Sequence, residues 1–346
     1  NSDSDELARR MAAEAAKALE ARRAFVLETI AEQGKLTDGL RRAILGAQSK
    51  VELEDLYLPY KQKRRTKATV ARERGLEPLA EQIWQQPHQG RPQQAARPFV
   101  DPKRDVPDVA AALEGARHIC SEWVAETPAA RQTVRETLWQ HARLTSKATK
   151  AAKSQRTRFE QYYDFAEPVR RIPGHRYLAV CRGEADKMLR VGLELDDDRL
   201  VGRLERVAGV DRRSPFAREL AEAVADAYKR LLKPSVTTEV RGRLKRQADE
   251  AAVGIFGKNL RELLLAAPFG GRPVLAVDPG LRTGCKVVAL DATGSFLANV
   301  TIFPGRNPKQ DASAREAVLA LARRHQPDLI AVGNGTGGRE TEGWLK

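Results

Sequence analysis

Apolar residues recur every three or four positions along most of the first 267 residues, which predicts a mainly helical region. The longest segment of this kind is residues 5–33, which ends at Gly34, a residue that favours helix termination. Shorter helices are predicted at 38–47, 67–74, 78–85, 108–125 and 128–143, and again over 215–232 and 234–267. Thr66 and Asp108 precede two of them and are expected to act as N-caps.

Two later segments have the pattern of β-strands. Residues 176–182 and 189–195 are separated by Gly-Glu-Ala-Asp, which predicts a small β-hairpin at about 176–195. After the Gly/Pro-rich linker at 269–273, VLAVD, CKVVALD and SFLANVTIF predict three antiparallel strands. A helix at 308–325 and a fourth strand, DLIAVGN, follow. This order is that of the first half of a ribonuclease-H-like α/β fold.

These patterns predict three regions. Residues 1–160 form a helical N-terminal region, and residues 161–268 form a central helical region with the small hairpin. Residues 274–346 form the first half of the ribonuclease-H-like domain, so the fold class is mainly α followed by an incomplete α/β domain. The sequence contains no apolar run of membrane-spanning length and no signal-peptide pattern, so we expect a cytoplasmic protein. The spacing of the three cysteines and five histidines predicts no metal site, and we expect no cofactor.

Positive charge is concentrated before the α/β region. The net charge is +14, and residues 274–346 carry nine Lys and Arg against seven Asp and Glu, which leaves +12 in residues 1–273. Such a field attracts polyanions such as nucleic acid, although it also favours solubility alone.

Two stretches carry this charge without acidic residues among them. The first follows Leu56, Tyr57 and Tyr60, apolar residues that are expected to anchor it to the helical scaffold. The second lies within 141–158, where a helix would place its cations within about 80° of one another. Both stretches are predicted to contact phosphates, or else to be solvated surface. Their candidate nucleic-acid-binding residues are Lys61, Lys63, Arg64, Arg65 and Lys67, and Arg143, Lys147, Lys150 and Arg158.

The predicted helices at 67–74 and 78–85 also allow a helix-turn-helix interpretation. Ala71 and Gly75 have the spacing of that motif. Arg74 and Glu81, however, stand where the motif requires apolar packing. A recognition helix at 78–85 is therefore a minor alternative.

Asp278 ends the first predicted strand of the α/β region, beside a glycine-bearing turn. In a two-metal nuclease such an aspartate holds Mg²⁺, and in sugar kinases a similar turn binds nucleotide phosphate; a plain turn cap is the third interpretation. The fourth strand ends at Asn334, where a metal nuclease requires an acid. An amide brings no negative charge to a hard dication, so we predict a degenerate site with no catalytic residue. The sequence contains no Walker-type phosphate loop.

Three long blocks resemble the Tex family of bacterial transcription accessory proteins. They are LEDLYLPYKQKRRTKATVARERGLEPLA, LLLAAPFGGRPVLAVDPGLRTGCKVVALD and LIAVGNGTGGRETE, in that order. The resemblance implies a helical N-terminal region and a YqgF-type ribonuclease-H-like domain without nuclease activity. It also implies helix-hairpin-helix elements and an OB-fold nucleic-acid-binding domain, which are expected beyond Lys346. The family is related to a eukaryotic transcription elongation and histone-chaperone factor.

The function expected from the residues and the resemblance together is that of a non-enzymatic, nucleic-acid-binding transcription accessory factor. It would bind RNA or DNA independently of sequence, without a membrane and as a monomer, with proteins of the transcription machinery as further partners. One alternative is a protein-interaction scaffold whose nucleic-acid binding resides in the OB-fold. A less favoured alternative is a Mg²⁺-dependent nuclease or resolvase centred on Asp278.

Overall fold

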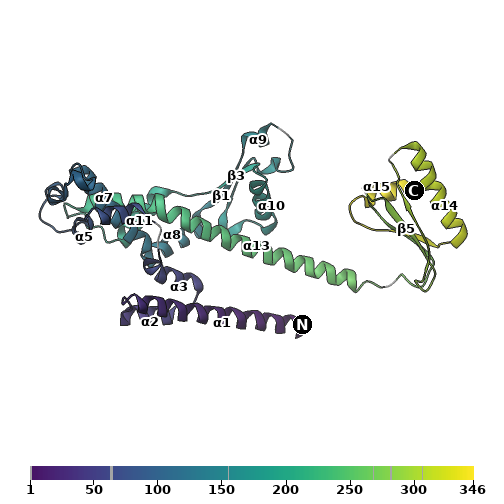
Figure 1. Cartoon of the computed structure of the whole chain (residues 1–346), viewed down its shortest axis with the longest axis horizontal. Coiled ribbons are helices and arrows are strands. Elements are labelled where there is room, and N and C mark those ends of the chain that lie inside the picture. Colours follow the sequence, from purple (N-terminus) through teal and green to yellow (C-terminus); the bar gives the residue numbers. More distant parts are fainter. Residues whose placement is uncertain (1, 63–64, 155, 268, 281–282, 306) are drawn as a thin grey trace. The chain divides into compact units, whose positions relative to one another are not determined.

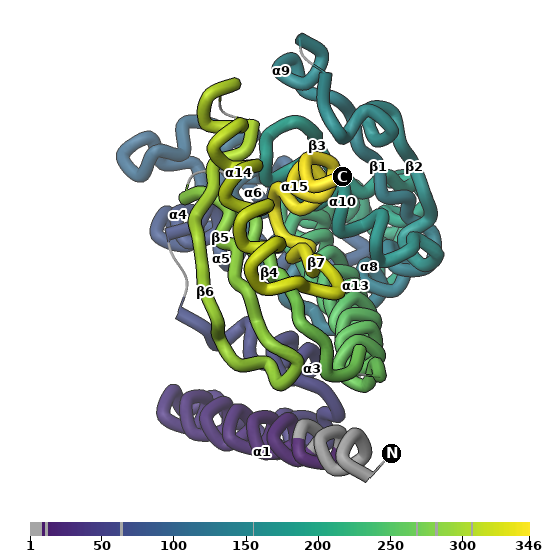
Figure 2. The backbone as a smooth tube through the Cα atoms, turned by 90° about the vertical axis from the view of Figure 1, so that its right-hand side faces the viewer, coloured from purple at the N-terminus to yellow at the C-terminus, as the bar shows by residue number. Residues whose placement is uncertain are grey.

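The computed structural model describes residues 2–62, 65–154, 156–267, 269–280, 283–305 and 307–346. The chain divides into two compact units, Asn1–Phe256 and Gly257–Lys346, which are described separately (Figures 1 and 2). The first unit is mainly helical and contains one small sheet, and the second is an α/β unit. The predicted fold class is therefore confirmed, whereas the predicted boundary near residue 160 does not separate compact units.

The first unit contains thirteen α-helices among its described residues, the last of which continues into the second unit. They are α1 (Ser2–Glu32), α2 (Asp38–Gly46), α3 (Lys50–Tyr57), α4 (Lys67–Glu73), α5 (Glu77–Gln85), α6 (Pro92–Ala96), α7 (Val109–Glu126), α8 (Pro128–His141), α9 (Lys150–Lys153), α10 (Gly174–Ala185), α11 (Asp197–Val207), α12 (Ala217–Asp226) and α13 (Lys233–Leu264). Short 3₁₀ turns, η1 (Leu58–Tyr60), η2 (Arg97–Phe99), η3 (Pro102–Arg104), η4 (Glu160–Tyr162) and η5 (Val169–Arg171), and a π-helical segment, η6 (Ala227–Leu232), lie between them. Thr66 and Asp108 cap α4 and α7 as predicted.

Helix α7 lies at the centre of the first unit, where α4, α5 and α12 pack against it. Small residues on α7 allow this close approach. At Gly115 an added Cβ would lie only 2.3 Å from Leu76 Cδ1, so a larger residue would displace the buried Leu76 side chain. Leu76, Ile119 and Phe216 are fully or almost fully buried in the resulting core.

The small sheet has three antiparallel strands rather than the predicted two. Its order is β2 (Asp164–Pro168), β1 (Arg143–Ala148), β3 (Leu189–Glu194), so β1 is central. The predicted hairpin at 176–195 is wrong because the whole of its first strand, 176–182, belongs to helix α10. Tyr177 and Val180 are three residues apart and both buried, which is a helical spacing. Only the second predicted strand is correct, and it pairs with β1 instead.

Helices α1 to α3 form a small core of their own around Val26, Ile30 and Ile44. Arg23 of α1 is 9% exposed and reaches the end of α2. Its guanidinium donates hydrogen bonds to the carbonyl oxygens of Ile44 and Leu45, both at 2.6 Å, and of Ala47, at 3.1 Å. The last carbonyls of a helix have no partner within the helix, so this arginine caps α2 from a neighbouring helix.

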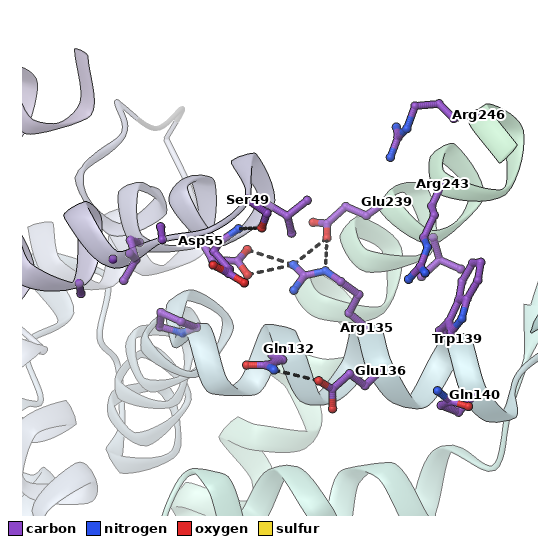
Figure 3. Close-up of a pocket in the computed structure, with 18 residues that line it drawn as sticks. Ser49, Asp55, Gln132, Arg135, Glu136, Trp139, Gln140, Glu239, Arg243 and Arg246 are labelled. Atoms are coloured by element: carbon purple, nitrogen blue, oxygen red, sulfur yellow. Dashed lines mark hydrogen bonds and ion pairs between the residues drawn. The ribbon is translucent and has the colours of Figure 1, made fainter. Parts of the chain in front are cut away.

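A buried cluster of charged side chains connects α3 to the rest of the first unit (Figure 3). Asp55 of α3 accepts hydrogen bonds from Arg131 (2.8 Å) and Arg135 (2.9 Å), both on α8. Both arginines also bond to Glu239 of α13. The side chains of Asp55 and Arg131 are each only 8% exposed, whereas those of Arg135 and Glu239 are 20% and 32% exposed, so the ion pair of Asp55 with Arg131 is the buried part of the cluster.

The second unit has the strand order predicted from its sequence. Strands β6 (Phe296–Ile302), β5 (Cys285–Leu290) and β4 (Val274–Asp278) are antiparallel, and β7 (Leu329–Val332) lies parallel to β4 (Figure 2). Helix α14 (Pro308–His325) connects β6 to β7 and buries Ala314 and Val318 against the sheet. Helix α15 (Gly338–Leu345) follows β7. Its Trp344 donates a 2.6 Å hydrogen bond to Asp311 and so ties α15 to the start of α14.

Helix α11 lies in a stretch for which no element was predicted, although Leu200 and Leu204 give it a buried face. Among the described residues, no helix combines the length and apolar character needed to cross a membrane.

Replacing Asp55 with asparagine is expected to lower the free energy of local opening of α1–α3 by about 3–5 kcal/mol, because it leaves two buried arginines facing a neutral amide. Native-state hydrogen exchange of the amides of α1 to α3 measures this change. Glu54→Gln is the matched control, since Glu54 pairs with Arg22 in a half-exposed position and should change the same quantity by less than about 1 kcal/mol. Equal effects of the two substitutions would show that the buried cluster does not hold α3.

Candidate nucleic-acid interface

The second predicted basic stretch does not form a helix. Helix α8 ends at His141, and Arg143–Ala148 is strand β1 between two partner strands. The expectation of one basic helix face over 141–158 is therefore wrong. Leu144, Thr145 and Ser146 are all buried between the exposed Arg143 and Lys147, as expected for a central strand with a partner on both sides.

The four residues predicted on that face are separated in the structure. Arg143 lies at the start of β1 and donates a 2.9 Å hydrogen bond to the carbonyl of Ala166. Arg158 forms a 3.1 Å ion pair with Asp186 and is partly neutralised. Lys147, at the other end of β1, and Lys150, at the start of α9, are both exposed. Only these last two come together in a way that favours phosphate.

Two further cations, which the sequence did not indicate, lie beside Lys147 and Lys150. Arg190 of β3 is the register partner of Lys147 on β1, so the two side chains share one exposed face of the sheet. Thr149 donates hydrogen bonds to the carbonyl oxygens of Lys187 (2.9 Å) and Met188 (3.0 Å), which brings the turn before β3 against the start of α9.

We call Lys147, Lys150, Lys187 and Arg190 the basic tip. Figure 1 shows α9 at the end of β1 and β3, standing out from the helical body. All four side chains are exposed, and none forms an ion pair with another described residue. Asp164 of β2 is the register neighbour of Lys147 on its other side, so a carboxylate lies beside this lysine. Among the residues in and around the two predicted basic stretches, the basic tip has the strongest local concentration of unpaired positive charge.

The first predicted stretch is placed only in part. Lys63 and Arg64 lie outside the described residues. Leu56, Tyr57 and Tyr60 pack in the core of α1–α3, as predicted, and the exposed Lys61 follows directly.

The other two residues of this stretch belong to α4 and its N-terminal flank. Arg65 forms a 2.7 Å ion pair with Glu73, the last residue of α4, so this cation is partly neutralised. Lys67 begins α4 and is exposed. Burial and the charge of Lys67 together hold the pKa of His118 below its ordinary range. Figures 1 and 2 place α4 away from α9, so the two stretches do not form one continuous patch.

The helix-turn-helix interpretation receives no support from α5. Its sequence, Glu77–Gln85, contains two acidic residues and no Lys or Arg. Leu79, Ala80 and Ile83 are buried, so Glu81 and its neighbours form the exposed face. An acidic face is repelled by DNA phosphates, and α5 is therefore unsuited to a groove.

Asp278 and Asn334 lie at the same end of the second sheet, where β4 and β7 finish. Strands β4 and β7 are parallel, and Gly333 donates a 2.9 Å hydrogen bond to the carbonyl of Val277, which places the ends of both strands side by side. Asn334 and Glu340 line a cavity of about 400 Å³ at the start of α15, and Asp278 is not among its lining residues. Among the described residues, no three His, Cys, Asp or Glu side chains are grouped to hold a metal ion.

The backbone around this edge is closely packed at glycines. At Gly338 an added Cβ would lie 2.6 Å from the carbonyl oxygen of Gly333, and at Gly280 it would lie 2.4 Å from that of Gly284. Both contacts are with backbone, which cannot rotate away. Close packing therefore explains Gly280 and Gly338, whereas an added Cβ at Gly335 would meet no atom within 4 Å.

Comparison with known proteins agrees with both units. Residues 87–256 match the Tex central region-like family, and residues 272–346 match the Tex protein YqgF-like domain. The protein tex of Bordetella pertussis is 40% identical over 330 residues, which is 92% of this chain and 42% of the relative. The transcriptional accessory protein Tex of Neisseria gonorrhoeae is 39% identical over 329 residues, 94% of this chain and 42% of the relative. This chain belongs to the Tex family.

A more distant relative is the S1 RNA-binding domain-containing protein 1 of Pongo abelii, which is 30% identical over 334 residues, 92% of this chain and 33% of the relative. The chain thus spans less than half the length of these curated relatives. The Tex central region match covers α6 to α12 and most of α13, together with the three-stranded sheet and the basic tip, and it ends at the same residue as the first compact unit.

Replacing Gly338 with alanine should destabilise the Tex YqgF-like unit by about 1–3 kcal/mol, because its Cβ would force the Gly333 carbonyl out of place. Hydrogen exchange of the amides of β4, β7 and α15 reports this loss. Gly335→Ala is the matched control, since an added Cβ there meets no atom within 4 Å. If Gly335→Ala destabilises the unit as much as Gly338→Ala, the close approach is not the cause.

Proposed function

We propose that this chain is the non-enzymatic, nucleic-acid-binding part of a Tex-family transcription accessory protein. Its basic tip would contact the phosphates of RNA or DNA. The observation that carries this proposal is the convergence of Lys147, Lys150, Lys187 and Arg190 from two strands and a short helix, without ion-pair partners among the described residues.

The chemistry of the basic tip suits phosphates better than base edges. Lysine is a flexible point charge with a compact, hydrated ammonium group, and it reads no pattern of donors and acceptors. Such contacts release condensed counterions, so binding would be independent of sequence and strongly dependent on salt. The excess of +12 in residues 1–273 adds long-range attraction of the same sign.

The names of the relatives are consistent with this role. Two are named as Tex or as a transcriptional accessory protein, and a third is named for an S1 RNA-binding domain. We propose that the whole protein acts in the cytoplasm as a monomer on nucleic acid, together with proteins of the transcription machinery. The basic tip would then supply a second, weaker phosphate contact beside any dedicated nucleic-acid-binding domain.

The absence of catalysis is part of the proposal. Asn334 stands at the end of β7, where a two-metal nuclease would place a carboxylate beside that of Asp278. Hard dications such as Mg²⁺ are held chiefly by anionic oxygen ligands, and a neutral amide leaves their charge unbalanced. We therefore assign the YqgF-like unit a structural or binding role.

Neutralising the basic tip should flatten the salt dependence of binding. For the variant Lys147→Gln, Lys150→Gln, Lys187→Gln, Arg190→Gln, we expect the slope of log K against log salt for single-stranded RNA to decrease in magnitude by up to about 3, since each lost phosphate contact removes about 0.7. Fluorescence anisotropy of labelled RNA across a series of salt concentrations measures the slope, and duplex DNA provides the comparison.

A control with the same change in charge separates local contacts from net charge. The residues Arg9, Lys17, Lys35 and Arg41 are exposed on or beside α1 and α2, and their replacement with glutamine should leave most of the slope intact. If both quadruple variants lose the same slope, only the overall charge matters. If the wild-type chain binds neither RNA nor DNA at low salt, the proposed function fails.

The chain should not cleave nucleic acid in the presence of Mg²⁺ or Mn²⁺. Incubation with labelled RNA, duplex DNA and branched DNA, followed by gel electrophoresis, tests this expectation. Asp278→Asn should leave nucleic-acid affinity unchanged, because it adds no cation to the basic tip. Cleavage that requires metal, stops with chelator and disappears in Asp278→Asn would establish a nuclease instead.

A further inference from the structure

A pocket of the first unit lies away from the basic tip. It has a volume of about 780 Å³ and is enclosed by the α2–α3 connection, α3, α8 and α13 (Figure 3). The pocket combines an apolar part with charged side chains and has no assigned role. Its size is sufficient for a few side chains of a bound segment.

The floor of the pocket is electrostatically satisfied. Asp55 and Glu239 line it, and both carboxylates are engaged by Arg131 and Arg135 in the buried cluster described above. Glu136 accepts a 2.8 Å hydrogen bond from Gln132. The carboxylates on the floor of the pocket are therefore already paired. Any unpaired charge that a ligand meets must come from other residues of the lining.

Two arginines of α13 supply that free charge. Trp139 is a residue of α8. The guanidinium of Arg243 stacks over its ring, 3.7 Å from the ring centre. The side chain of Arg246 folds back along α13 towards Gly242. One of its guanidinium nitrogens lies 3.8 Å from where a Cβ of residue 242 would be, and the glycine has no side chain to block this position. Neither arginine forms an ion pair with another described residue. Both line the pocket.

The stacked arginine has a defined binding chemistry. A guanidinium that lies over an aromatic ring is held in one orientation and retains the N–H groups at its edge. Those groups match a carboxylate in bidentate geometry, and Arg246 adds a second cation one turn away. Tryptophan and arginine are also the residue types that most often contribute large binding energies at protein interfaces.

The pocket also has an apolar part. Ala43 and Val51 lie on α2 and α3, and Leu56 and Val240 extend this surface inwards. Val51 is 41% exposed, which leaves an aliphatic surface uncovered at the mouth. The pocket thus requires one acidic and one apolar group, held close together.

Nucleic acid fits this pocket poorly. Glu52 and Glu136 lie at its exposed edge and would repel a continuous phosphate backbone. Arg243 covers a face of the Trp139 ring, where a base would stack. A peptide avoids both problems, because it can present a single carboxylate to the arginines and keep neutral backbone beside the two glutamates.

We propose that this pocket binds an acidic, apolar peptide segment of a partner protein. An Asp or Glu carboxylate pairs with Arg243 and Arg246, and a neighbouring large apolar side chain packs against Ala43 and Val51. The surface is separate from the basic tip, so the chain can hold nucleic acid and a protein partner at the same time.

Selection from a library of random dodecapeptides displayed on phage tests the proposal, with the whole chain as the target. The enriched sequences should contain Asp or Glu within a few residues of Leu, Ile, Phe or Trp. Enriched peptides are then synthesised with a fluorescent label, and their dissociation constants are measured by fluorescence polarisation. Versions with Asn and Gln in place of Asp and Glu should bind at least tenfold more weakly.

Variants of the pocket locate the binding. Arg243→Gln and Arg246→Gln should each weaken binding at least tenfold. Ala43→Trp should do the same by filling the apolar side while every cation is retained. Arg261→Gln, an exposed arginine of the same helix outside the pocket, should have no effect. Circular dichroism of each variant shows that α-helical content is preserved, and RNA affinity should remain within twofold of wild type.

Three results would overturn the proposal. Selection that yields no enriched peptides, or peptides without an acidic residue, removes the predicted chemistry. Enriched peptides that bind Arg243→Gln and Ala43→Trp as tightly as wild type place the binding elsewhere. Loss of RNA affinity in these variants, without any peptide binding, would assign the pocket to nucleic acid instead.

Discussion

The ion cluster of Asp55, Arg131, Arg135 and Glu239 is the interaction on which the arrangement of the first unit depends. It joins α3, α8 and α13, three helices distant in sequence, through charges that are largely removed from water. A cluster of this kind is costly to break because each unpaired charge would remain desolvated. It also fixes the distance between α3 and α13, and so defines the pocket between them.

The two surfaces of the first unit differ in how they expose positive charge. The basic tip presents four cations to solvent on strand ends and turns, where phosphates can approach from several directions. In the pocket beside Trp139, by contrast, the arginines are held against a ring and a helix, and carboxylates lie nearby. Freely exposed lysines suit a repetitive polyanion, whereas oriented arginines suit one defined carboxylate. A single basic protein can therefore separate nucleic-acid contact from partner recognition.

In a nuclease of this fold, the catalytic acids would lie at the ends of the strands that correspond to β4 and β7. In the second unit these strand ends are followed by glycine-rich turns. Gly280 and Gly338 allow backbone to approach backbone, and Asn334 replaces the second acid. The close approach makes this edge sensitive to added side chains, independently of any chemistry performed there. The unit has the strand order of a ribonuclease-H-like fold together with a Tex YqgF-like sequence.

Local sequence determined most helices, their caps at Thr66 and Asp108, and the whole strand order of the second unit, because periodicity and capping act between residues close in the chain. Tertiary structure decided the rest. Arg143–Ala148 became a strand because partner strands lay on both sides, and 174–185 became a helix that packs against β3 instead of pairing with it. The basic tip was hidden for the same reason. Arg190 meets Lys147 through strand register, and Thr149 holds the turn that carries Lys187 against the start of α9, contacts that no local pattern records.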